Sequence, residues 1–423
     1  METSIKNKII LIIMHYVLIA CMPLVCMSAT ALDVKTRRKI GLTKRDLSEI
    51  SRFIQSELPQ YVERKIYYLS PARTHLARAI EYDPQTKETF VILKGRKCLI
   101  GKGKKKKVYL ALRYHEKDFE IVARGEQTLP IERELEMTKK AQGMKGLFVT
   151  YGMTQHSRGQ DTLTAIYSKL YNKGSLKTVL EQHTQLTLYE KARIMAGILR
   201  GLESLHNKHI VHLDLGTRNY LIDISPGKKG TRTVRAVVAD LGRAKHFDRA
   251  KKVCAQGNSL YRAPEVILNL QHMQGRDYCK TDIYAAGCVF YQILFGKFGR
   301  WQKKCFMKDL SVPAIQRYHQ FVAALNRATG TRRKLLASKG RSGTLDGKEY
   351  LEFIILRMLH PDPEKRPTAR ELRQELGSYP LFQRESGQKR INHTRETACQ
   401  EMTHAPHVVE PDARDERASG KIV

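Results

Sequence analysis

The stretch Ile210 to Ile222, I-V-H-L-D-L-G-T-R-N-Y-L-I, decides how the rest of the chain is interpreted. Its ends are apolar and predict two short strands. Its centre predicts a polar loop in which Asp214 and Asn219 stand five positions apart. A carboxylate there can accept a proton from a hydroxyl group, and an amide oxygen beside it can bind a hard cation. The loop is therefore the first candidate for a catalytic site.

Four further motifs follow this loop. They are the apolar run Val234–Ala239 ending in Asp240-Leu241-Gly242, then Tyr261-Arg262-Ala263-Pro264-Glu265, then Asp282-Ile283-Tyr284-Ala285-Ala286-Gly287, and last Asp362-Pro363-Glu364-Lys365-Arg366-Pro367-Thr368. In order and spacing the five motifs resemble those of the protein-kinase superfamily. In the same order, the family's five patterns are H-R-D-L-x-x-x-N, D-F-G, Y-x-A-P-E, the Asp that opens the central buried helix, and the Arg that pairs with the A-P-E glutamate. The resemblance covers about Cys98 to Phe382.

This resemblance implies an α+β fold with a small β-rich N-terminal lobe and a larger helical C-terminal lobe. It implies a protein substrate, ATP and Mg²⁺. Asp214 would orient and deprotonate the acceptor hydroxyl, and Asn219 and Asp240 would hold Mg²⁺. His212 is interpreted as a packed structural histidine.

The phosphate-gripping region departs from the family pattern. Ile100-Gly101-Lys102-Gly103-Lys104-Lys105-Lys106-Lys107-Val108 resembles I-G-x-G-x-x-G-x-V, with Lys106 in place of the third glycine. Ile121-Val122-Ala123-Arg124 resembles V-A-I-K, with Arg124 in place of the phosphate-binding lysine. A lysine at the third-glycine position resembles the with-no-lysine kinases, in which the loop lysine reaches the phosphates. The alternative is that 104–107 is a solvated basic run.

The resemblance also assigns the surroundings of the nucleotide. Glu134 would pair with the phosphate-binding cation, and Glu132 or Glu136 would do so in another register. The backbone of Lys169 to Tyr171 would form the hinge that contacts adenine. The residues expected to touch the nucleotide are Ile100, Gly101, Gly103, Val108, Val122, Lys169, Tyr171 and Leu221.

Activity and acceptor remain open at this point. Leu213 replaces the arginine that would clamp a phosphate in the activation segment, so activation by phosphorylation there is not expected. Together with Arg124 and Lys106, Leu213 also favours the alternative of a pseudokinase that acts as a nucleotide-binding or scaffold module. Gly216 and Arg218 favour a tyrosine acceptor, whereas the run Gly257-Asn258-Ser259-Leu260-Tyr261 favours serine or threonine. A serine/threonine kinase is the main prediction.

Composition restricts the partners. The 423 residues carry a formal net charge of +33, which attracts anionic membranes or acidic proteins. No nucleic-acid-binding module is readable, and the oligomeric state is not indicated. Residues 9–26 contain no charge. They could be a membrane anchor that keeps the kinase domain in the cytosol, a cleaved export signal, or a buried segment.

These observations divide the chain into four parts. Residues 1–32 are the hydrophobic N-terminal segment, and 33–92 are a basic extension with one amphipathic helix, marked by Leu47, Ile50, Phe53 and Ile54, and one hairpin. Residues 93–383 are the kinase-like domain, and 384–423 are a polar, disordered tail.

Overall fold

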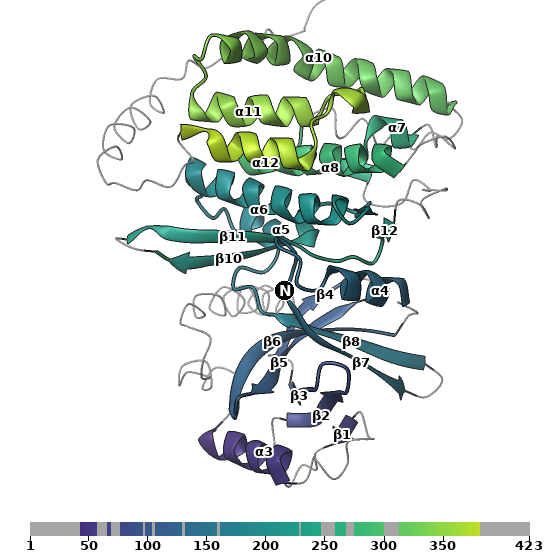
Figure 1. The fold of residues 1–423 in the computed structure, drawn as a ribbon, viewed down its shortest axis with the longest axis vertical. Coiled ribbons are helices and arrows are strands. Elements are labelled where there is room, and N and C mark those ends of the chain that lie inside the picture. Colours follow the sequence, from purple (N-terminus) through teal and green to yellow (C-terminus); the bar gives the residue numbers. More distant parts are fainter. Residues whose placement is uncertain are drawn as a thin grey trace, which may run out of the picture. The chain divides into compact units, whose positions relative to one another are not determined.

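The computed structural model describes residues 43–56, 66–68, 77–95, 98–103, 106–128, 132–158, 161–227, 230–246, 259–267, 275–299 and 313–380. The chain divides into two compact units, Met1–Phe382 and Gln383–Val423, and every described residue belongs to the first. Within that unit an antiparallel β-sheet is followed by a helix-rich region (Figure 1). The predicted α+β fold is therefore confirmed.

An eight-stranded antiparallel sheet forms the N-terminal lobe. Its strands pair in the order β1-β2-β3-β5-β6-β8-β7, and β4 pairs with one end of β5. The bounds are β1 Ile66–Tyr68, β2 Ala77–Asp83, β3 Glu88–Leu93, β4 Leu99–Lys102, β5 Lys107–His115, β6 Asp118–Gln127, β7 Thr150–Arg158 and β8 Asp161–Lys169. Helix α4 (Glu132–Ala141) lies between β6 and β7 in the chain.

The predicted N-terminal hairpin is β2–β3, and it is an integral part of this sheet. Strand β3 pairs with β5 from Thr89↔Tyr114 to Ile92↔Ala111. Adjacent residues Phe90 and Val91 point to opposite faces of β3 and are both fully buried. A boundary at residue 92 would cut this hydrogen-bonded sheet, so the hairpin belongs with the domain that follows it.

The sheet curls so that side chains of β2 reach β7. A carboxylate oxygen of Asp83 accepts a hydrogen bond from the backbone N–H of Met153 at 2.9 Å. The hydroxyl of Thr154 donates to the carboxylate of Glu81. Inside the curl the rings of Phe90 and Tyr167 stack 3.7 Å apart. This inner face of the sheet is therefore a closed core.

The predicted amphipathic helix is α3 (Lys44–Ser56). Its buried residues Ile50 and Ile54 pack in one cluster with Leu112 and Phe119 of the sheet. The expected docking of its apolar face on the small lobe is confirmed.

Helices make up most of the C-terminal lobe. They are α5 Leu176–Glu181, α6 Leu188–His206, α7 Pro264–Ile267, α8 Gly275–Phe295, α10 Ala314–Arg341, α11 Gly347–Met358 and α12 Ala369–Ser378. The described residues also include the 3₁₀ turns η3 Thr217–Asn219, in the polar loop between Val211 and Tyr220, η6 Ser259–Tyr261, before α7, and η7 Pro363–Lys365, between α11 and α12. Helix α6 begins with the capping box that its sequence predicts, formed by Thr187 and Glu190. Its inward residues join the main apolar core.

Two short two-stranded antiparallel sheets surround the polar loop. Strand β10 (Tyr220–Pro226) pairs with β11 (Arg232–Val238), and β9 (Ile210–Val211) pairs with β12 (Lys245–His246). The predicted strands on each side of the polar loop are therefore β9 and β10.

A buried ion pair joins helix α7 to the residue that follows η7, as the resemblance implied. Both terminal guanidinium nitrogens of Arg366 donate to the carboxylate of Glu265, at 2.6 and 2.8 Å. The side chain of Arg366 is 0% exposed. Both ends of this pair are desolvated, so loss of either would leave an uncompensated charge.

The expected N-terminal segment, residues 1–32, and the expected tail, 384–423, lie outside the described residues. Within the described ranges, no helix has the length and apolar character that crossing a membrane requires.

Candidate active site

The polar loop between β9 and β10 is held by Asp282, near the middle of helix α8. Its two carboxylate oxygens accept hydrogen bonds from the backbone N–H groups of His212 and Leu213, at 2.8 and 2.9 Å. Leu213 has a φ of +63°, a conformation that costs a non-glycine residue roughly 1–2 kcal/mol. Its side chain packs against the apolar cluster of Val211 and Tyr278. Asp282 therefore fixes a strained turn, and an apolar contact occupies the position of the expected arginine.

Asp214 and Asn219 are brought together by this turn. The side-chain nitrogen of Asn219 donates to the backbone oxygen of Asp214 at 2.6 Å. His212 is fully buried, accepts from the N–H of Asp214 through Nδ1, and donates through Nε2 to the backbone oxygen of Ala239 at 3.0 Å. These contacts are those of a structural histidine, as the sequence predicts.

Asp240 lies next to Asn219 because the strands on either side are bonded to each other. The N–H of Ala239 donates to the backbone oxygen of Asn219 at 2.9 Å. Asp240 then turns sharply with a φ of +64°, which aspartate tolerates better than most residues. An exposed carboxylate and an amide oxygen are ligands that Mg²⁺ accepts. The donor set therefore fits the metal that the sequence predicts, with water and phosphate oxygens completing its shell.

Lys106 makes the ion pair expected of a phosphate-binding cation. Its Nζ lies 2.8 Å from Oε1 of Glu134 on α4. The side-chain nitrogen of Gln127 donates to the other oxygen of Glu134 at 2.7 Å. Desolvation alone would lower the pKa of Lys106, but the charges of Glu134 and Asp240 raise it above its ordinary value. Lys106 is thus a charged group between the α4 carboxylate and Asp240.

Arg124 does not reach this group, and its predicted role in phosphate binding is wrong. Its guanidinium donates to the hydroxyl of Tyr167 at 3.0 Å and to Glu81 at 2.9 Å, and it also pairs with Glu126. Desolvation opposes its charge, yet Tyr167 and both carboxylates keep the pKa of Arg124 above its ordinary value. The side chain is 3% exposed, inside the curl of the sheet.

Val122 requires the same correction. Side chains alternate between the two faces of a strand, so Val122 and Arg124 share one face of β6. Val122 is fully buried against Phe90 and Tyr167 inside the curl. It therefore cannot line a nucleotide pocket on the side where Lys106 lies.

Gln127 and Gly125 occupy the opposite face of β6. Val108 pairs with Gly125 in the β5–β6 ladder, and this register continues to place Lys106 opposite Gln127. A Cβ atom on Gly125 would lie 2.7 Å from Cε of Lys106, so glycine leaves room for the lysine stem. Sequence reasoning missed both residues. No local signal marks them, because the Glu116-Lys117 turn that sets the β5–β6 register contains neither Asn nor Gly.

The glycine loop is described as far as Gly103 and again from Lys106. The N–H of Gly103 donates to the backbone oxygen of Lys106 at 2.8 Å, which closes a tight turn. Gly101 pairs with Val108 across β4 and β5, and Ile100 beside it is 43% exposed. These residues and Lys106 therefore belong to one structural unit.

The predicted hinge joins β8 to α5. The backbone N–H of Lys169 donates to Val149 at 2.9 Å, and its Nζ lies 2.5 Å from the carboxylate of Asp223 on β10. The ring of Tyr171 is buried, and its hydroxyl accepts from the N–H of Val149 at 3.1 Å. Leu221, also on β10, forms a bridge with Ser175. The hinge is thus anchored to the strand that follows the catalytic loop.

The guanidinium of Arg243 contacts Asp214. Nε of Arg243 lies 3.3 Å from Oδ2 of Asp214. Gly216, two positions after Asp214, is packed under Tyr261, whose ring would lie 3.0 Å from an added Cβ. A lysine at position 216 would therefore displace that ring. Arg243 was not found from the sequence, because only the folded chain brings it to Asp214.

Comparison with known proteins gives a consistent result. The protein kinase domain family matches residues 96–376. The chain is 25% identical over 221 residues to the mitogen-activated protein kinase pmk-1 of Caenorhabditis elegans, covering 48% of this chain and 50% of that protein. It is 33% identical over 127 residues to the serine/threonine-protein kinase ULK1 of Homo sapiens, covering 29% and 11%.

A third relative bears the word inactive in its name. The inactive serine/threonine-protein kinase PLK5 of Mus musculus is 26% identical over 208 residues, covering 48% of this chain and 28% of that protein. The chain spans half or less of the length of these three relatives.

Proposed function

We propose that this chain, which belongs to the protein kinase domain family, transfers the γ-phosphoryl group of ATP to a serine or threonine hydroxyl of a protein. The observation that carries the proposal is the ion pair of Lys106 with Glu134, close to Asp240. This ion pair places a cation beside Glu134. Strand β6 supplies none there, because the residue that faces Lys106 from β6 is the uncharged Gln127. The names of the relatives as serine/threonine kinases support the choice of acceptor.

Each group near the pair has a role in this reaction. Bound Mg²⁺ would neutralise phosphate charge, with Asp240 and Asn219 as its protein ligands. Lys106 holds the phosphates, Glu134 pairs with Lys106, and Gln127 holds Glu134 in place by donating to its other carboxylate oxygen. Asp214 accepts the proton of the acceptor hydroxyl. This arrangement supports the interpretation that the loop lysine replaces the usual strand lysine, as in the with-no-lysine kinases.

A pseudokinase is the second candidate. Gln127 on β6 and Leu213 in the catalytic loop support it, and one relative is named as inactive. In that case the chain would bind a nucleotide or a partner protein without transferring phosphate.

Lys106→Met is expected to lower phosphoryl transfer roughly 10²–10³-fold, the range found when one preorganised charge-stabilising donor is removed. The matched control is Lys107→Met, because Lys107 is the next residue and is exposed. Its rate is expected to stay within about twofold of the original. Labelled phosphate incorporation into a generic protein substrate, or into the chain itself, measures both rates.

A swap variant sharpens this test. Lys106→Gly with Gln127→Lys moves the cation from the residue before β5 to the facing position on β6, and is expected to recover part of the activity that Lys106→Gly loses. Equal activity of Lys106→Gly and the original chain would refute the role of Lys106. Absence of turnover in the original chain would instead favour the pseudokinase.

Asp240→Ala is expected to remove the Mg²⁺-dependent part of ATP binding, since the metal loses its fixed carboxylate. Thermal shift with ATP, with and without Mg²⁺, measures this in the full chain. This result is expected for a kinase and for a nucleotide-binding pseudokinase. A Mg²⁺-dependent shift as large as in the original chain would contradict the metal role.

A further inference from the structure

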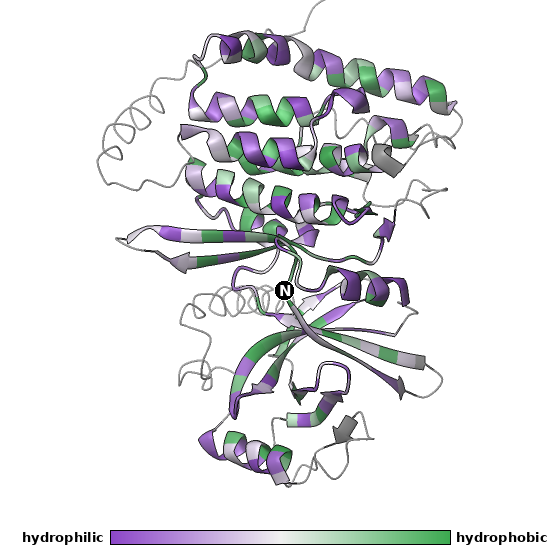
Figure 2. Cartoon of the chain, in the orientation of Figure 1, coloured by the Kyte–Doolittle hydropathy of each residue, from purple (hydrophilic) through white to green (hydrophobic). Residues whose placement is uncertain are grey.

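Helix α10 carries seven basic residues and no acidic residue along its 28 positions. Hydrophilic residues recur along its whole length in Figure 2. Figure 1 shows it beyond α11, against which it packs. A helix with this composition has no acidic side chain of its own to pair with these cations, so any ion pair that they form is with another element or with a partner.

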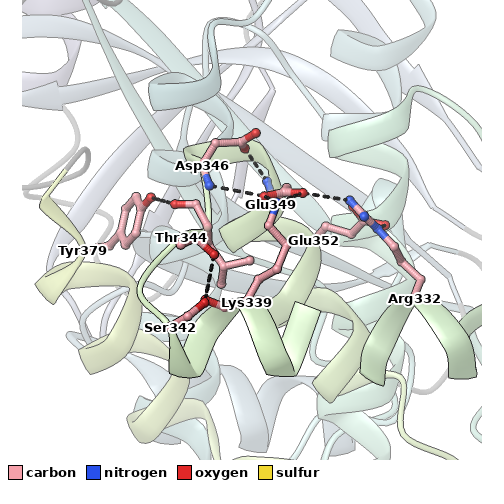
Figure 3. Close-up of polar contacts among 9 residues, drawn as sticks. Arg332, Lys339, Ser342, Thr344, Asp346, Glu349, Glu352 and Tyr379 are labelled. Carbon is pink, nitrogen blue, oxygen red and sulfur yellow. Dashed lines mark hydrogen bonds and ion pairs between the residues drawn. The ribbon is translucent and has the colours of Figure 1, made fainter. Parts of the chain in front are cut away.

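The inner basic row of α10 is balanced by α11. Figure 3 shows Arg332 and Lys339 facing the carboxylates of Glu349 and Glu352. Lys339 Nζ lies 2.5 Å from Glu349, and Arg332 lies 2.8 Å from Glu352. Hydrogen bonding from Lys339 lowers the pKa of Glu349, so that carboxylate stays charged. The inner row is therefore used in packing the two helices.

The outer basic row of α10 has no such partner. Arg327, Lys334 and Arg341 are exposed and seven residues apart, so they follow one stripe with a drift of about 20° per step. Among the residues that the structure describes, no carboxylate forms an ion pair with any of the three. Thr331 and Ser338 lie between them and add no charge. The row is uniformly positive and polar.

The geometry of this row fits a flat anionic surface. Seven residues advance about 10.5 Å along a helix, so the row is straight and about 21 Å long. No aromatic side chain occurs between Arg327 and Arg341, so the row lacks the stacking platform that single-stranded nucleic acid uses. The uncharged sequence run 9–26 adds an apolar segment suited to a bilayer.

We infer that the outer row of α10 binds an anionic membrane surface through Arg327, Lys334 and Arg341. Each cation near an anionic leaflet contributes about 1 kcal/mol, so three cations strengthen binding by roughly 100-fold. Because the stripe is polar, binding is electrostatic and weakens as salt rises. This inference is independent of whether the chain transfers phosphate.

The test uses the full chain and vesicles of phosphatidylcholine with or without about one third phosphatidylserine. Arg327→Glu/Lys334→Glu/Arg341→Glu is expected to weaken binding to the anionic vesicles at least 100-fold at physiological salt. The control is Arg52→Glu/Arg78→Glu/Lys117→Glu, which reverses three exposed cations elsewhere. It changes net charge equally and is expected to lower affinity by less than about fivefold. Circular dichroism verifies that both variants fold.

Three outcomes would overturn the inference. The α10 variant could bind as the original chain does, or lose no more affinity than the control. The original chain could bind phosphatidylcholine vesicles equally well, which would assign binding to an apolar segment. It could also bind a polyuridine RNA more tightly than the anionic vesicles and lose that affinity in the α10 variant, which would assign the row to nucleic acid.

Discussion

Replacing Asp214 by Asn is expected to slow phosphoryl transfer about 10²–10⁴-fold, the range for loss of a positioned general base. Asparagine keeps the size of the side chain and leaves the hydrogen bond from Asn219 intact, because that bond uses the backbone oxygen of residue 214. It removes the proton acceptor and the charge that Arg243 contacts. The loss should therefore fall on the chemical step.

Separate measurements of binding and turnover distinguish this from misfolding. Mg²⁺-ATP should raise the melting temperature of Asp214→Asn as much as that of the original chain. Glu116→Gln, which neutralises an exposed turn carboxylate, should leave the rate unchanged. Transfer by Asp214→Asn at the original rate would contradict the proposed mechanism. Loss of ATP binding in this variant would show that Asp214 supports the site structurally.

The sequence was sufficient for the fold because its motifs are local. Asp214, Asn219 and Asp240 stand at the ends of short apolar strands, and their spacing fixes how those strands meet. The buried pair of Arg366 with Glu265 could also be predicted, since both ends lie in recognisable motifs. In each of these cases the chemistry and the local structure point to the same arrangement.

The side of β6 that faces the site could not be predicted, because it depends on one turn. Glu116 and Lys117 form the two-residue turn between β5 and β6 with φ values of 49° and 65°. Turns of this kind usually contain Asn or Gly, and this one gives no such signal. Since side chains alternate, the register set by this turn puts Gln127 beside Lys106 and sends Arg124 to the other face.

Tertiary contacts account for what else the sequence left unseen. Gly216 looks like a missing lysine in the sequence, but in the fold its place is closed by the ring of Tyr261. Arg243 reaches Asp214 from the turn after Asp240. Both facts depend on how two loops approach each other, which no local pattern encodes.

Arg124→Met is expected to destabilise the fold by about 3–5 kcal/mol, the usual cost of removing one partner from a buried ion pair. Glu81 is fully buried, so without Arg124 its carboxylate keeps the hydroxyl donors Tyr167 and Thr154 and the ring of His156, whose Nδ1 lies 3.8 Å away. The melting temperature should fall by roughly 10 °C. Arg78→Met, on the exposed side of β2, is the matched control and should change it little.

The double variant Arg124→Met with Glu81→Leu decides whether charge is the cause. Removing both partners leaves no fully buried charge without a partner, because Glu126, the other carboxylate that Arg124 contacts, is 17% exposed to solvent. Most of the lost stability should therefore return. At temperatures well below its melting point, Arg124→Met should transfer phosphate at nearly the original rate, because its guanidinium points into the curl of the sheet and away from Lys106. A variant that melts normally but has lost transfer would mean that Arg124, and not Lys106, binds the phosphates.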